Sequence, residues 1–169
     1  MKKSGYYRFP TIHKNNLVFV CEDDLWLYNI KDKSLSRLTS NHGPVSCPRI
    51  SPDGKHIAFT GTEDGDMEVY IMPLLGGESR RLTYFGSHVK VVGWKNNKEV
   101  LFSSNYGMPF QRMSDIYSVN INGSFPSCLS FGMGNDIAKD NTSIILGKNT
   151  ADPARWKRYR GGTAGEIWI

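Results

Sequence analysis

Cysteine is scarce in this sequence, and its spacing points to no covalent or metal-held framework. Three cysteines, Cys21, Cys47 and Cys128, occur among 169 residues. They are odd in number and far apart, whereas disulfide scaffolds and zinc sites need paired or clustered thiols. Each lies on or beside an expected strand, where a small buried thiol is common.

Long apolar runs are also missing. Lys2 and Lys3 open the chain, but no apolar segment follows them, so the start does not resemble a secretory signal. No stretch elsewhere approaches the length of about 20 apolar residues that a transmembrane helix needs. We therefore expect a cytoplasmic protein with no membrane partner.

Signatures of known catalytic sites are absent. The sequence contains neither a Gly-x-Ser-x-Gly elbow nor a His-Glu-x-x-His motif. Ser104, His88 and Asp115 would be candidates for a triad if the fold brought them together. No elbow or oxyanion-hole glycine turn accompanies them. We therefore predict no catalytic residue and no cofactor in this chain.

Charge is spread thinly along the chain, whose formal net charge is +5. One dense basic run is interleaved with aromatic residues: Arg155, Trp156, Lys157, Arg158, Tyr159 and Arg160. Such a run can bind nucleic acid, but it is short and no nucleic-acid-binding motif accompanies it. We favour a solvated loop whose aromatic side chains pack on a sheet, and expect no nucleic-acid partner.

Acidic residues cluster in two corresponding turns, 22–24 and 63–66. Glu22, Asp23 and Asp24 form the first cluster. Carboxylates this close can hold a calcium ion, but the spacing fits no EF-hand loop, and turns favour Asp and Gly in any case. We favour solvated turns and predict no metal site.

The stretch from Cys47 to Thr83 holds one complete structural unit. Four short segments separated by polar turns predict four antiparallel strands: Pro48–Ser51, His56–Thr60, Glu68–Met72 and Ser79–Thr83. Asp53-Gly54 supplies the positive φ that a tight turn between the first two needs. Four such strands over roughly 40 residues match one blade of a β-propeller.

The same unit recurs along the chain. Arg-Leu-Thr ends it at 37–39 and again, 44 residues further on, at 81–83. An aromatic residue recurs in the third strand of each copy, at Trp26, Tyr70, Tyr117 and Trp168. We expect this residue to anchor each blade against its neighbour. The expected blades are residues 7–39, 47–83, 89–130 and a partial copy at 134–169.

These repeats predict an all-β fold, an incomplete β-propeller with about three four-stranded antiparallel blades plus part of a fourth. Closed propellers typically have about four to eight blades. We therefore expect the chain to be a fragment of a longer protein. Its terminal blades would leave faces uncovered, so the isolated chain should self-associate.

One expected loop, residues 105–113, is longer and more apolar than its counterparts. It separates the second and third expected strands of the third blade. Such a loop can line a channel mouth, contact a neighbouring domain, or fold over its own blade.

Four strings carry a family resemblance. Pro-Arg-Ile-Ser-Pro-Asp-Gly-Lys-x-Ile-Ala-Phe at 48–59 is similar to the repeat of TolB-like and peptidase-associated propellers. Three further strings narrow it: 19–26, 81–85, and 156–163 leading into 167–169. Together and in this order they resemble the N-terminal propeller of tricorn-type proteases over nearly the whole chain.

The resemblance implies a function as well as a fold. Tricorn-type proteases are large cytosolic serine peptidases that assemble as hexamers and trim oligopeptides released by the proteasome. They begin with a six-bladed propeller that serves as a passage, and their catalytic residues lie beyond the segment matched here. This implies a propeller that does no chemistry itself, partnered by the remaining protease domains and by oligopeptides. The alternative is a TolB-like propeller that acts as a protein-binding scaffold.

The family's carboxylate-binding arginine pair has no counterpart here. That pair lies in the loop that enters the third blade, and residues 86–90 of this chain contain no adjacent arginines. Arg80 and Arg81 precede the loop but match the end of a strand. We do not assign the role to them, and contact between a peptide and His88 or Lys90 stays open.

Overall fold

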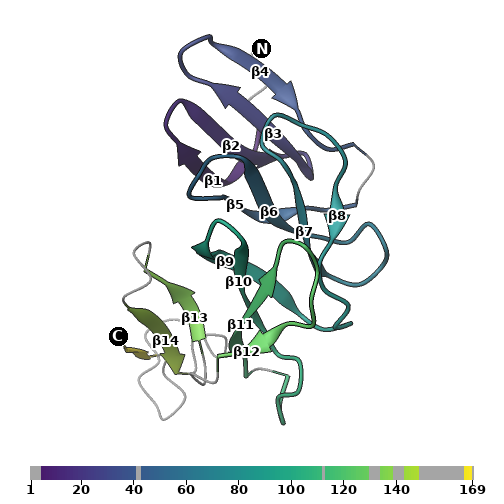
Figure 1. Cartoon of the computed structure of the whole chain (residues 1–169), viewed down its shortest axis with the longest axis vertical. Helices are drawn as coiled ribbons and strands as arrows, with labels where there is room; N and C mark the ends of the chain where they lie inside the picture. Colours follow the sequence, from purple (N-terminus) through teal and green to yellow (C-terminus); the bar gives the residue numbers. More distant parts are fainter. Residues whose placement is uncertain are drawn as a thin grey trace.

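The computed structural model describes residues 5–40, 43–111, 113–129, 134–138, 143–148 and 166–168. Within these ranges all the regular secondary structure is β-strand. The described residues therefore contain no helix that could span a bilayer. The strands form three four-stranded sheets and one three-stranded sheet, each in chain order (Figure 1). Every pairing is antiparallel. The predicted all-β, incomplete propeller is confirmed.

The strand bounds follow the repeat. In chain order they are β1 (Tyr7–His13), β2 (Asn16–Cys21), β3 (Asp24–Asn29), β4 (Ser34–Arg37), β5 (Ser46–Ile50), β6 (His56–Gly61), β7 (Glu68–Pro73), β8 (Arg80–Arg81), β9 (Val89–Asn96), β10 (Glu99–Ser104), β11 (Asp115–Asn120), β12 (Ser127–Cys128), β13 (Gly134–Ile137), β14 (Ile144–Lys148) and β15 (Glu166–Trp168).

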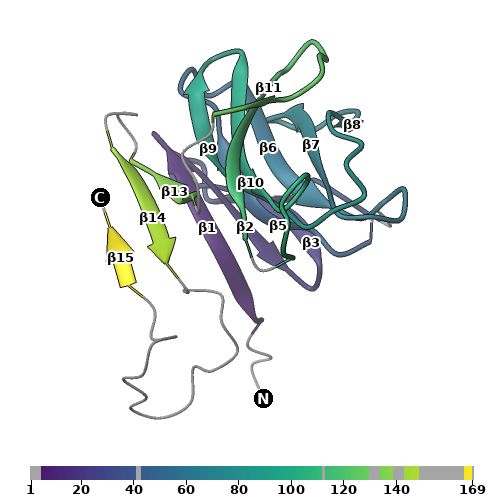
Figure 2. The ribbon, with the colours of Figure 1, turned by 90° about the horizontal axis from the view of Figure 1, so that it is seen from below.

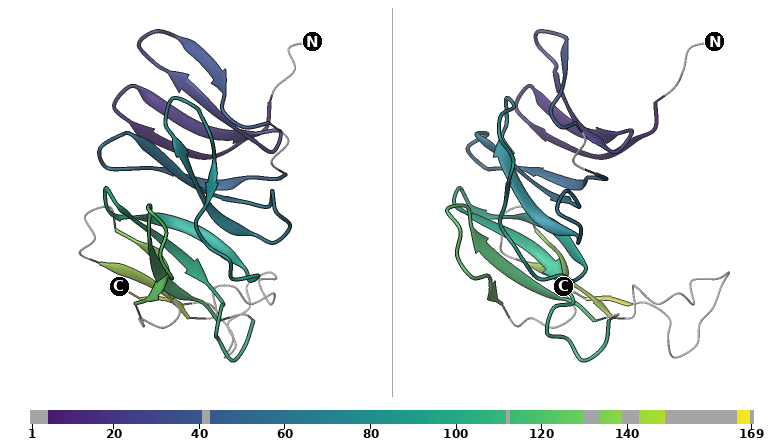
Figure 3. Two further views of the ribbon diagram at one scale, coloured as in Figure 1. Left: turned by 45° about the vertical axis from the view of Figure 1, so that its right-hand side comes forward. Right: turned by 90° about the vertical axis from the view of Figure 1, so that its right-hand side faces the viewer.

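The sheets are stacked face to face in chain order (Figure 3). The first strands of successive sheets contact one another, β1 with β5, β5 with β9 and β9 with β13. The later strands of each sheet spread outward from this inner edge (Figure 2). This is the arrangement of propeller blades around an axis.

Apolar side chains fill the space between neighbouring sheets. Val18 and Leu25 of the first sheet belong to one buried cluster with Phe59 and Tyr70 of the second. Ile71, on the opposite face of the second sheet, belongs to the cluster shared with the third sheet. Because β6 and β7 are covered on both faces, their side chains are buried almost without interruption instead of in alternation.

The recurring aromatic residue occupies the same place in the second and third sheets. Tyr70 pairs with Phe59 across the strands, with ring centroids 5.7 Å apart and ring planes 21° apart. Tyr117 pairs with Phe102 in the same way, at 5.6 Å and 19°. Both tyrosines are buried in the clusters between neighbouring sheets. The predicted role as an anchor between blades is confirmed for these two residues.

Trp26 has the equivalent position in the first sheet. It pairs with Phe19, and its Nε1–H donates to the carbonyl of Cys21, 3.2 Å away in the turn between β2 and β3. Its ring is half-buried, because no other described sheet covers this face of the first sheet (Figure 1). The side chain of Trp168 lies outside the described residues.

The fourth strand of the second sheet is shorter than the sequence predicts. The expected strand Ser79–Thr83 is reduced to β8, Arg80–Arg81, and Thr83 lies beyond it. The Thr83 hydroxyl turns inward, where it accepts the N–H of Val69 at 2.9 Å and donates to the carboxylate of buried Glu68. The hydroxyl of Thr83 therefore replaces the backbone carbonyl that would accept the N–H of Val69 in a longer strand.

The first sheet repeats this arrangement. The Thr39 hydroxyl accepts the N–H of Leu25 at 2.9 Å and donates to Asp24 at 2.9 Å. Arg37 pairs with Asp24 as Arg81 pairs with Glu68. The repeated Arg-Leu-Thr string thus holds a buried acidic residue at the start of β3 and of β7. We name each set of acidic residue, arginine and threonine a carboxylate clamp.

Candidate functional site

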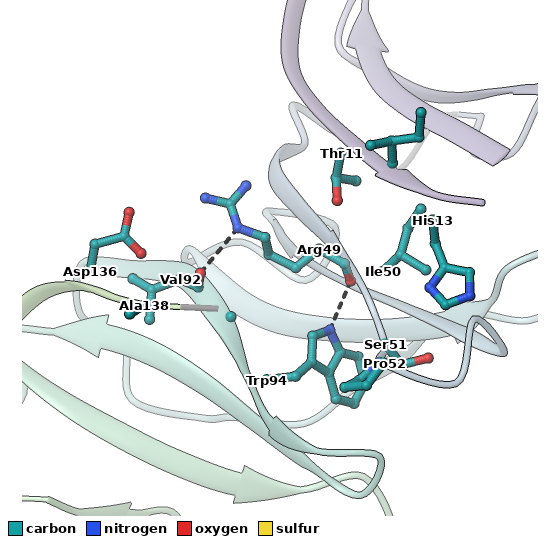
Figure 4. A pocket seen from close by; sticks show the side chains of 12 residues that line it. Thr11, His13, Arg49, Ile50, Ser51, Pro52, Val92, Trp94, Asp136 and Ala138 are labelled. Carbon is teal, nitrogen blue, oxygen red and sulfur yellow. Dashed lines mark hydrogen bonds between the residues drawn. The ribbon is translucent and has the colours of Figure 1, made fainter. Parts of the chain in front are cut away.

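The inner edges of the sheets border a cavity of ≈ 530 Å³. All four first strands contribute to its wall. Side chains of different character face it: Thr11 and His13 of β1, Arg49 of β5, Trp94 of β9 and Asp136 of β13 (Figure 4). Because these residues come from separate sheets, the cavity exists only once the sheets have packed together.

Arg49 and Trp94 join the second and third sheets at this wall. The Nε–H of Arg49 donates to the carbonyl of Val92 at 3.0 Å, and the indole N–H of Trp94 donates to the carbonyl of Arg49 at 2.9 Å (Figure 4). An Nη1–H of Arg49 also donates to the carbonyl of Pro48 at 3.2 Å. These bonds fix the guanidinium and the indole at the cavity surface.

The cavity wall suits binding better than reaction. It carries a positive charge from Arg49, a negative charge from Asp136 and the flat indole of Trp94. Such a surface offers hydrogen bonds and stacking to polar main-chain groups of a peptide. The Ser51 hydroxyl at its edge is already used in the adjoining turn, where it donates to Asp53 at 2.7 Å and accepts the N–H of His56 at 3.0 Å. The bond from Ser51 lowers the pKa of Asp53.

That turn also fixes the first sheet against the second. Gly54 has a φ of +73°, as the Asp-Gly turn predicts, and the His13 ring lies 2.8 Å from the place where a Cβ would stand. A side chain at residue 54 would therefore displace His13 from the cavity wall.

The structure brings the three triad candidates to one end of the third sheet. Ser104 pairs with Asp115 across β10 and β11, and with Val89, which follows His88, across β9 and β10. Ser104 is only 1% exposed, and its Oγ accepts the N–H of Tyr106 at 3.1 Å. The burial closes Ser104 to a substrate, while His88 is exposed.

The acidic turns direct their carboxylates to arginine side chains. Asp23 pairs with Arg8 at 2.8 Å, and Asp64 lies 3.6 Å from Arg81, which also pairs with Glu68. Within the described ranges no three side chains of His, Cys, Asp or Glu gather as metal ligands would. The basic run at 155–160 lies outside the described residues.

The described part of the loop at 105–113 packs against the end of its own blade through Tyr106. The Tyr106 ring stacks on Phe85 with centroids 4.0 Å apart, and the Tyr106 carbonyl accepts the hydroxyl of Tyr117 at 2.6 Å. The loop and His88 line a second cavity of ≈ 580 Å³. Lys90 is exposed on β9 nearby. Whether a peptide contacts His88 or Lys90 stays a prediction.

Sequence reasoning missed the residues that define the inner wall. Arg49 falls in an expected strand and Trp94 within an expected blade, but nothing in their local spacing shows that they meet. The available signal was their place in the first strand of two successive copies, since first strands line the axis of a propeller.

Comparison with known proteins identifies the family. The family model of the tricorn protease N-terminal β-propeller domain matches residues 4–169. Tricorn protease homolog 1 of Streptomyces coelicolor is 39% identical over 167 residues, which are 98% of this chain and 16% of that protein. The putative tricorn-like protease N-terminal subunit of Sulfurisphaera tokodaii is 37% identical over 98% of this chain and 86% of its own length.

Solved structures agree with the sequence matches. The crystal structure of the tricorn protease superposes with a TM-score of 0.79 at 31% identity, over 97% of this chain and 17% of that chain. TolB from Acinetobacter baumannii gives a TM-score of 0.73 at 19% identity over 96% of this chain and 40% of that chain, which shows a shared fold. The chain belongs to the family of tricorn protease N-terminal β-propeller domains.

Proposed function

We propose that this chain forms part of the wall of a passage for oligopeptides in a cytosolic, tricorn-type serine peptidase. The cavity at the inner edge of the sheets carries the proposal, because its wall of Arg49, Trp94 and Asp136 can bind polar main-chain groups. Burial of Ser104 supports a propeller that does no chemistry itself. The nucleophile then belongs to the remaining domains of the protease.

The partners follow from the same proposal. They are the remaining protease domains, in the same polypeptide or in a separate subunit, with assembly into a hexamer and oligopeptides as the substrate. A TolB-like scaffold has less support, since the tricorn relatives match at 39% and 37% identity over 98% of this chain, whereas a TolB homolog matches at 30% over 76% of it.

The test is a steric block in the complete protease. Thr11→Trp places a large ring on the inner wall, whereas Glu78→Trp places the same ring on an exposed turn as a control. We expect Thr11→Trp to lower kcat/KM for long oligopeptides more than for dipeptide-sized substrates, and Glu78→Trp to lower neither. Equal loss for both substrate lengths would contradict a passage.

A second experiment tests the absence of chemistry. The chain alone should hydrolyse no fluorogenic oligopeptide. Turnover that Ser104→Ala abolishes would overturn the assignment of the nucleophile to other domains.

A further inference from the structure

A groove lies on the outer side of the arc, away from the inner wall. It has a volume of ≈ 440 Å³ and is bordered by the end of the second sheet and by the turn between β11 and β12. Buried Leu82 and half-buried Phe85 line it. At its rim, Tyr84 is 75% exposed and Phe125 is 80% exposed. Two large aromatic side chains in water at one groove are unusual for a surface without a partner.

The groove is held in shape by its own contacts. The guanidinium of Arg81 lies over the ring of Tyr84, 4.4 Å from its centroid. Arg80 donates to the carbonyl of Ile121 and so ties the second sheet to the turn of the third. Phe125 lies 6.3 Å from Phe85, centroid to centroid, in a tilted arrangement. A groove organised in this way loses little conformational freedom when it binds.

The repeat supplies an internal comparison. The cross-strand pairs Trp26 with Arg37, Tyr70 with Arg81 and Tyr117 with Cys128 align the three sheets. By this alignment, Ser36 corresponds to Arg80, Ser40 to Tyr84 and Glu78 to Phe125. The first member of each pair is exposed and lies at the junction of the first and second sheets, and the second member lies at the junction of the second and third. The first junction forms with small or polar residues at these places. The fold therefore does not require an arginine and two aromatics at the second.

We propose that this groove docks a short extended segment of a partner protein, with a bulky apolar side chain next to a carboxylate. Aromatic residues and arginine are the types enriched at the centres of protein interfaces. The charged residues among those lining the groove are Arg80 and Arg81. Glu68 pairs with Arg81, so exposed Arg80 gives the rim its positive charge. A carboxylate on the partner complements that charge.

Blocked pentapeptides and amide NMR of the full chain test the proposal. The probe is Ser-Asp-Phe-Asp-Ser, with Ser-Lys-Phe-Lys-Ser and Ser-Asp-Ala-Asp-Ser as matched counterparts. We expect the first peptide to shift the amide resonances of Arg80, Tyr84 and Phe125, and to bind at least about tenfold more tightly than either counterpart. Equal binding of the lysine or alanine peptide would overturn the charge or the apolar part of the proposal, and shifts confined to other residues would overturn the site.

A second test uses variants that carry, at the groove, the residues found at the junction of the first and second sheets. The triple variant Arg80→Ser, Tyr84→Ser and Phe125→Glu should lose the shifts, whereas Leu75→Ser, at an exposed leucine outside the groove, should keep them. Arg80→Ser alone should lower the affinity if the triple variant does not fold. Shifts that persist in these groove variants would refute the proposal. Concentration-dependent broadening confined to the groove resonances, without peptide, would show a second copy as the occupant of the groove and refute the proposal as well.

Discussion

The hydroxyl of Thr83 and the carboxylate of Glu68 form a hydrogen bond in the interior of the second sheet. Glu68 is 0% exposed, and its other carboxylate oxygen accepts from Arg81 at 3.1 Å and from the N–H of Gly86 at 2.8 Å. A buried carboxylate is tolerable only with this degree of pairing. The clamp connects the start of β7 to the chain that leaves the second sheet.

Replacement of Thr83 by valine should destabilise the protein. The variant keeps the shape of the side chain but leaves the N–H of Val69 and one oxygen of Glu68 without a partner. We expect the free energy of unfolding, measured with urea, to fall by about 2 kcal/mol. Ser36→Ala, at an exposed strand position, should change it by less than about 0.5 kcal/mol. Equal effects of the two variants would contradict the clamp.

The two arginines of the clamps should differ in importance. Arg81 is 17% exposed and faces a fully buried carboxylate, whereas Arg37 is 47% exposed. Arg81→Met leaves Glu68 buried without its cation, and we expect a loss of about 3 kcal/mol in unfolding free energy. Arg37→Met should cost about 1 kcal/mol or less because water screens that pair. Parallel urea titrations give the comparison, and a larger loss for Arg37→Met would contradict it.

The recurring aromatic residue should contribute more to the free energy of unfolding where it packs between two sheets than where it lies on an uncovered face. Tyr70→Ala opens a space in the cluster shared by the first and second sheets, and we expect a loss of about 3–5 kcal/mol. Trp26→Ala removes a larger ring, yet from a half-buried place on the first sheet. We expect the smaller loss for Trp26→Ala, measured by urea unfolding. The reverse order would show that the first sheet is covered on its Trp26 face.

Stability at alkaline pH should depend on Tyr117. Burial, followed by the neighbouring Cys128 and Asp115, raises the pKa of Tyr117 from 10.0 to about 12. Between these two values the unfolded state loses a proton that the folded state keeps. The free energy of unfolding should therefore fall as pH rises from 10 to about 12.

Tyr117→Phe tests this titration. The variant cannot ionise at residue 117, so its unfolding free energy should fall less steeply across that alkaline range. At neutral pH it should be about 1 kcal/mol less stable, because the hydroxyl bond to the carbonyl of Tyr106 is lost. Urea unfolding over a pH series measures both effects. A decline as steep as that of the unchanged chain would contradict the role of Tyr117.

Features that depend on local spacing were predictable from sequence. Asp53-Gly54 predicted a tight turn, and the spacing of Tyr70 and Tyr117 predicted equivalent anchors, because each copy carries its own pattern. The carboxylate clamp was not predicted. Thr39 and Thr83 look like strand residues, and their inward turn is decided by a buried carboxylate that lies 15 residues earlier in the chain.

Features that arise from convergence of separate sheets were not predictable. Arg49 and Trp94 are 45 residues apart, and the bond between them forms only after the second and third sheets have packed. The sequence could not decide between the three roles considered for residues 105–113. The stacking of Tyr106 on Phe85 joins residues 21 positions apart, and no local sequence pattern predicts such a contact.

The faces of each sheet are unlike, and this gives the stack a direction. Tyr70 and Phe59 point toward the preceding sheet, while Ile71 and Val69 point toward the following one. In the second sheet the equivalent face is covered by aliphatic side chains of the first sheet, Val18, Leu25 and Leu27, so the Trp26 face suits an aliphatic partner surface. A contact between the Trp26 face of one copy and a different face of another would be heterologous, and such a contact closes into a ring only where its rotation permits and otherwise extends as a filament.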